Sequence, residues 1–132
     1  MNMNRYIIAV VASFIVMGII AFGLTTLMAD QLASVFALSR GPEGMAEMGG
    51  WSMGGYLVVT SVFCYIYIKG REAGDIIEGL KFGAMFGVLM CGISMVNYST
   101  FPFEMMGMGA DMIINIIVYS AGGVTASVVY KP

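Results

Sequence analysis

Long apolar stretches separated by short polar segments dominate the chain. Four stretches reach the roughly 20 residues that a helix needs to cross a bilayer, and they predict helices over about 6–28, 50–68, 76–98 and 112–130. The expected fold is all-α: one transmembrane domain, residues 1–132, forming an antiparallel up-down four-helix bundle. Apolar and polar residues mix over 29–39, so this segment is expected either to extend the first helix or to lie at the membrane interface.

The composition agrees with this pattern. Hydrophobic residues make up 59% of the chain and charged residues 11%, against roughly a quarter charged in soluble domains. The net charge of −2 comes with no basic stretch, so nucleic acid is not an expected partner. Histidine is absent, which removes bis-histidine haem, histidine-ligated metals and Ser-His catalysis. No cofactor is expected. Cys64 and Cys91 differ in expected depth by roughly 15 Å, too far for a disulfide.

The basic residues predict the orientation. All but one lie at one end of the predicted helices; these are Arg5, Lys69, Arg71, Lys81 and Lys131, and Arg40 is the exception. The positive-inside rule then places both termini in the cytoplasm, and the expected location is the bacterial plasma (inner) membrane. Leu27-Met28-Ala29 is a poor cleavage site, so the first helix is expected to be retained. The opposite face is acidic and carries Asp30, Glu43, Glu47, Glu104 and Asp111.

Two acidic residues predict how the third helix begins. Asp75 and Glu78 have the spacing of a capping box, with Asp in place of Ser or Thr, after a short turn over 69–74. The second and third helices are therefore expected to form an antiparallel hairpin. A loop containing Pro102 precedes the fourth helix, for which Asp111 is the expected cap.

Small residues recur at helical spacing on the third and fourth helices. The candidate packing residues are Gly79, Gly83, Gly87 and Cys91 on the third and Gly122 and Ala126 on the fourth. In lipid, such stripes let helix backbones approach closely. The stripe on the third helix faces either a neighbouring helix of the same chain or another copy or partner.

Polar residues are expected to meet near the outer ends of these two helices. The candidate polar pocket comprises Asn97, Tyr98, Asn115 and Tyr119 with Glu104 and Asp111. It would be either a small site for a polar headgroup, quinone or cation, or a set of interhelical hydrogen bonds, each worth about 1 kcal/mol or less.

Methionines cluster before the second and fourth helices. Thioethers are soft ligands that select Cu(I), and the candidate ligands are Met45, Met48, Met105, Met106 and Met108. The copper hypothesis requires the two clusters to lie within a few ångströms of each other, and the chain has many other methionines that serve as apolar filler. No metal site is expected.

These patterns favour a non-catalytic membrane protein. No acid, histidine or reactive cysteine pair forms a catalytic constellation, so no enzyme activity is expected. We expect a structural or accessory subunit, or a self-assembling element, of a larger membrane complex, with the lipid bilayer and other subunits or copies of itself as partners. The alternative is a homo-oligomeric pore or carrier for a small solute or cation. No ionisable residue is expected in the hydrocarbon core, which counts against ion-coupled transport of the small multidrug type.

Overall fold

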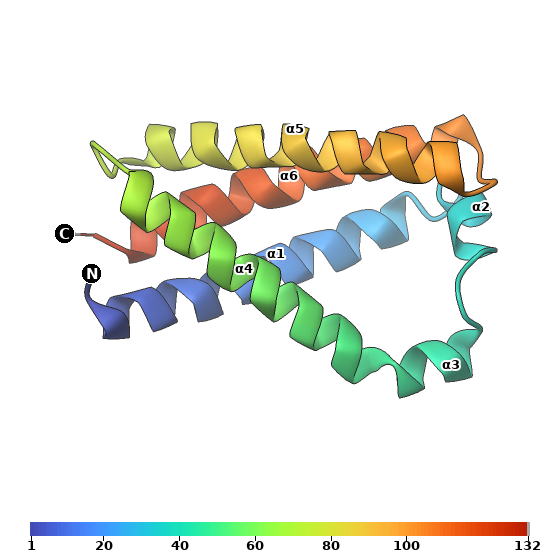
Figure 1. Ribbon diagram of the computed structural model, residues 1–132, viewed down its shortest axis with the longest axis horizontal. Helices are drawn as coiled ribbons and strands as arrows, with labels where there is room; N and C mark the ends of the chain where they lie inside the picture. The colour runs from blue at the N-terminus through green and yellow to red at the C-terminus, as the bar shows by residue number, and fades with distance from the viewer. Residues whose placement is uncertain (132) are drawn as a thin grey trace.

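The computed structural model of the protein describes residues 1–131 (Figure 1). All the regular secondary structure in this part of the chain is α-helix. The four long helices are α1 (Met3–Leu27), α4 (Gly49–Gly70), α5 (Ile76–Thr100) and α6 (Met105–Val129). Two short helices, α2 (Ala33–Phe36) and α3 (Pro42–Glu47), lie between α1 and α4. The long helices are each long and apolar enough to cross a membrane. Their length and composition suggest a multi-pass membrane protein, as the apolar pattern predicts.

The long helices expose many large apolar side chains, and several of their buried residues are small. Phe22 and Trp51 are 78% and 82% exposed, whereas Ala9 and Ser13 are fully buried. A surface of this kind in water would form apolar patches far larger than soluble proteins carry. In lipid it has no such cost, and contact faces of small residues let helices approach closely.

Consecutive long helices run in opposite directions, and both termini lie at the same end (Figure 1). α5 and α6 form the most extensively packed pair, α1 lies along α6, and α4 crosses α1. We call the end that carries both termini and the α4–α5 turn the terminal end. The end that carries α2, α3 and the α5–α6 turn is the loop end.

α4 joins the other helices in its half nearest the terminal end. Where it crosses α1, Ala9 and Cys64 are both fully buried, and Cys64 Sγ lies 3.8 Å from the Ala9 carbonyl oxygen. The Tyr6 hydroxyl donates to the Ser61 carbonyl at 2.9 Å. From this crossing toward the loop end α4 diverges from the hairpin (Figure 1), and residues 50–58 are all exposed.

The predicted cap of α5 is confirmed. Asp75 is the N-cap residue, and its carboxylate accepts from the Glu78 backbone N–H at 2.7 Å. The Glu78 carboxylate reaches back into the turn and accepts from Glu72 N at 2.6 Å and from Gly74 N. Gly74 has φ +69°, a conformation that favours glycine. These contacts set the tight reversal between α4 and α5.

Tyr130 ties the terminal end together. The Arg71 guanidinium lies 4.4 Å from the centre of the Tyr130 ring and donates to the Tyr130 carbonyl. The Tyr130 hydroxyl accepts from Asn2 N at 2.9 Å, and Arg5 donates to the Lys131 carbonyl. Both ends of the chain and the α4–α5 turn are thereby held in one place.

The start of the last helix differs from the prediction. α6 begins at Met105, with Glu104 at the N-cap position, so Asp111 is inside the helix and does not cap it. Gly107 and Gly109 had the composition of a loop, which is why the sequence predicted a later start. Gly107 instead packs against α2, since a Cβ on Gly107 would lie 2.8 Å from Val35 Cγ2.

The segment 29–39 does not extend α1. α1 ends at Leu27, and the chain turns through Met28 before forming α2. Leu32 is buried, and the Ser34 hydroxyl accepts from Glu104 N at 3.0 Å. α2 therefore packs against the start of α6, where it helps to build the loop end.

Candidate functional site

The glycine face of α5 packs directly on the backbone of α6. A Cβ on Gly83 would collide with the Tyr119 carbonyl oxygen, and a Cβ on Gly123 would collide with the Gly79 carbonyl oxygen. A Cβ on Gly87 would lie 2.7 Å from a Cα of α6. Only glycine allows backbones to come this close, so the α5 stripe faces a helix of its own chain.

Two adjacent glycines of α6, Gly122 and Gly123, face two different helices. Cys91 is buried at the end of the α5 stripe, beside α6. Gly122 faces α1, where a Cβ would collide with Met17 Sδ, and Ala126 is fully buried. Gly123, which sequence reasoning did not select, is the residue that faces α5. Its position next to Gly122 was the available signal, because two adjacent glycines can face two different helices.

Three polar side chains meet between α5 and α6 near the loop end. The Ser94 hydroxyl donates to the Asp111 carboxylate. Asn115 Nδ2 donates to the same carboxylate oxygen at 3.3 Å and lies 3.4 Å from Ser94 Oγ. Asp111 and Asn115 are four residues apart and share a helix face, and Ser94 continues the glycine face of α5. Ser94 was absent from the predicted pocket.

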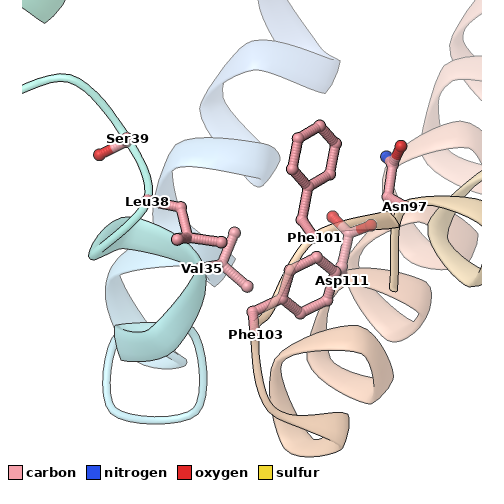
Figure 2. A pocket seen from close by; sticks show the side chains of 7 residues that line it. All are labelled: Val35, Leu38, Ser39, Asn97, Phe101, Phe103 and Asp111. Atoms are coloured by element: carbon pink, nitrogen blue, oxygen red, sulfur yellow. The ribbon is translucent and has the colours of Figure 1, made fainter. Parts of the chain in front are cut away.

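A cavity of about 330 Å³ opens beside this cluster (Figure 2). Its walls come from the segment around α2, from the end of α5 with the following turn, and from α6. The lining residues are Val35, Leu38, Ser39, Asn97, Phe101, Phe103 and Asp111. Figure 2 shows the Asp111 carboxylate between the Phe101 and Phe103 rings and Asn97, with Val35 and Leu38 opposite. The phenylalanines of the turn gave no sequence signal beyond their apolar character.

The position of Asp111 along α6 is unusual for an acid. It is the seventh residue of the helix, about 9 Å along the axis from the first. A helix of 25 residues is about 37 Å long, against a hydrocarbon core of about 30 Å. If α6 were centred in the bilayer, Asp111 would lie inside the hydrocarbon boundary; the expectation that no ionisable residue lies there stays a prediction. Within residues 1–131, its hydrogen-bond partners are the neutral Ser94 and Asn115.

The other residues of the predicted pocket are dispersed. The Tyr98 ring packs edge-on against Phe103, with centroids 5.8 Å apart. Glu104 is exposed at the start of α6. Tyr119 lies deeper, against Phe63 at 5.7 Å and Phe86 at 4.9 Å between ring centroids. The structure thus places Asn97 and Asp111 in the lining of the cavity, leaves Asn115 hydrogen-bonded to Asp111 beside it, and leaves Tyr119 in the interior.

Aromatic rings fill the interior between α4 and the α5–α6 hairpin. Phe63 of α4 is fully buried and contacts Phe82 at 4.9 Å and Phe86 at 5.1 Å between ring centroids. Tyr67 packs on Phe82 at 5.4 Å. The Tyr67 hydroxyl is buried with no hydrogen-bond partner among residues 1–131, beside a second cavity of about 250 Å³ at the terminal end.

The two methionine clusters lie on different elements of the loop end. Met45 belongs to α3 and Met48 follows it, whereas Met105, Met106 and Met108 lie in the first turns of α6. Figure 1 shows α3 set well apart from the end of the hairpin where α6 begins. In residues 1–131 there is also no group of three or more Cys, Asp or Glu residues that could hold a metal ion. The arrangement does not bring the proposed Cu(I) ligands together.

No protein-family model, curated protein or solved structure matches the chain. Two features of the chain bear on its function: the diverging half of α4, and the cavity that Asp111 lines.

Proposed function

We propose that the protein is a non-catalytic membrane subunit that assembles with another membrane protein, or with copies of itself, through the diverging half of α4. In this proposal the four long helices cross the bacterial inner membrane alternately, with both termini in the cytoplasm. The observation that carries it is that residues 50–58, in the half of α4 that diverges from the hairpin, are all exposed.

This half of α4 has the composition of a helix contact. Gly50, Gly54 and Gly55 have open space where a Cβ would be, and Gly50 and Gly54 have the four-residue spacing of a small-residue stripe. Glycine inside a helix costs about 1 kcal/mol relative to alanine. Facing lipid, these glycines would bring that cost with no packing gain. A helix from a second protein would supply the missing contact.

The alternative, a homo-oligomeric pore or carrier, has one observation in its favour. Asp111 lines a cavity and lies inside α6, as the acids of cation pathways do. Against it, the aromatic rings around Phe63 fill the interior between this cavity and the one at the terminal end. A conducting path would have to form between copies, which again requires assembly.

Photo-cross-linking in native membranes tests the assembly proposal. A photoreactive residue replaces Leu57, one turn from Gly54, and an identical one replaces Val88, which is exposed on α5. We expect a discrete adduct from position 57 and none from position 88, because only α4 contacts a partner. Mass spectrometry of the adduct identifies it as a second copy or another protein.

Two glycine substitutions supply the matched comparison. Gly54→Leu places a large side chain on the proposed contact and should lower the adduct yield about tenfold, the effect of about 1.4 kcal/mol of lost packing. Gly92→Leu places the same side chain on an exposed glycine of α5, which also has open space around it, and should leave the yield unchanged. An adduct that survives Gly54→Leu at full yield would overturn the proposal.

A further inference from the structure

The loop-end cavity joins one acid to largely apolar walls. Asp111, Asn97 and Ser39 are its polar lining residues, and the others are apolar or aromatic: Val35, Leu38, Phe101 and Phe103. Its volume of about 330 Å³ lies in the range of small-molecule sites, about 300–1,000 Å³. We propose that this cavity binds an ammonium group attached to an apolar body, with the Asp111 carboxylate as the counter-ion.

The charge of the site favours a cation. The donors that orient the Asp111 carboxylate, Ser94 and Asn115, are neutral. The basic residue of the loop end, Arg40, is exposed and does not line the cavity. Asp111 is half-buried, and an ion pair with a partly buried acid is screened less than one with a fully exposed acid.

The lining excludes other classes of ligand. Dedicated Zn²⁺ and Ca²⁺ sites are built from several protein ligands, whereas Asp111 is the single carboxylate among the residues that line the cavity. An anion would face the Asp111 carboxylate directly. An ammonium group instead suits one carboxylate beside aromatic faces, which attract cations, and its apolar body suits Val35 and Leu38.

Two sources can supply this chemistry. One is a free hydrophobic amine that enters from the membrane surface, and the other is the ethanolamine headgroup of a phospholipid. Both present a primary ammonium that can donate to the carboxylate, and both have an apolar portion to place against the walls. The site is independent of the assembly proposed above, since it is built from α2, α5 and α6 of one chain.

Binding measurements on the full chain distinguish the sources. In the first arm, phenethylamine and its neutral analogue 2-phenylethanol are titrated by calorimetry into protein in phosphatidylcholine nanodiscs. In the second arm, protein equilibrated with equal amounts of phosphatidylethanolamine and phosphatidylglycerol is examined by native mass spectrometry. Saturable binding of the amine but not the alcohol supports a free amine ligand. Selective retention of phosphatidylethanolamine supports the lipid headgroup.

Three variants tie the binding to the cavity. Asp111→Asn keeps the acceptor for Ser94 and removes the charge, so it should weaken binding about tenfold or more, as loss of a charge-assisted hydrogen bond does. Glu104→Gln removes an exposed acid at the same end and should leave binding unchanged. Leu38→Trp fills the cavity from the opposite wall without touching the acid, so it should block binding even where Asp111→Asn does not fold. Failure of both ligands to bind, or equal binding by Asp111→Asn, overturns the proposal.

Discussion

The glycines of α5 and the glycines of α4 share a spacing and differ in surroundings. Gly79, Gly83 and Gly87 are buried against the backbone of α6. Gly50 and Gly54 are exposed, with open space around both. The same sequence feature therefore occurs once in a completed contact and once on a free surface. A small-residue stripe indicates that a helix can be approached closely, but it does not specify which helix approaches.

The connections beside each helix explain why the two stripes differ. α5 connects to α6 through residues 101–104, so the two helices are held side by side and the glycine face closes on its neighbour. α4 is preceded by the long segment that contains α2 and α3. That segment lets α4 enter at an angle, cross α1 near Cys64 and leave its other half without a partner.

The largest effect is expected where the contact is already complete. Gly83→Ala adds a Cβ that would collide with the Tyr119 carbonyl oxygen, and two helix backbones must then separate. We expect the free energy of unfolding to fall by about 3 kcal/mol, the upper end of the usual overpacking cost. Steric-trapping or detergent-unfolding measurements on the purified protein in bicelles check this value.

Gly92→Ala is the control for that measurement. It lies in the same helix with open space around it, so the substitution changes helix propensity alone and should not destabilise the protein. If Gly83→Ala and Gly92→Ala had the same stability, Gly83 would not pack against the backbone of α6.

A smaller effect is expected at the joint that holds α4 to the hairpin. Phe63→Ala removes a fully buried ring that contacts Phe82 and Phe86. We expect a loss of about 2 kcal/mol in the free energy of unfolding, less than for the same change in a water-soluble core, because lipid offers no hydrophobic driving force between helices. Val62→Ala, at an exposed neighbour on α4, should change the free energy of unfolding by much less. Equal losses would mean that the aromatic cluster does not anchor α4.

Much of the fold follows from local sequence. Runs of apolar residues predicted four membrane-length helices, and the spacing of Asp75 and Glu78 predicted the start of α5. These features depend on residues close together in the chain. The predicted start of α6 was wrong because glycines such as Gly107 are typical of loops. Only the contact between Gly107 and Val35 shows why a glycine suits the helix at that position.

The candidate site was predictable only in part. Asp111 and Asn115 share a face of one helix, so their proximity could be inferred from spacing. The cavity beside them could not, because Val35 and Phe103 come from segments distant in the chain and carry no periodic signal. Tyr119 had the correct spacing but belongs to the aromatic interior, since it is two turns further along α6 than Asp111.

The smallest expected effect concerns the exposed glycines of α4, Gly50 and Gly54, where a substitution should raise the free energy of unfolding rather than lower it. Gly54→Ala adds a Cβ into open space and replaces the residue with the greatest backbone freedom, so the free energy of unfolding of the isolated monomer should rise by about 0.5 kcal/mol. The same methyl group would hold a partner helix further away, so cross-linking at position 57 should fall while monomer stability rises. The measurement is unfolding in dilute detergent, where chains are separated, set beside cross-linking in membranes. A fall in monomer stability of about 1 kcal/mol or more would mean that Gly54 packs within its own chain, and the contrast between the two stripes would then be removed.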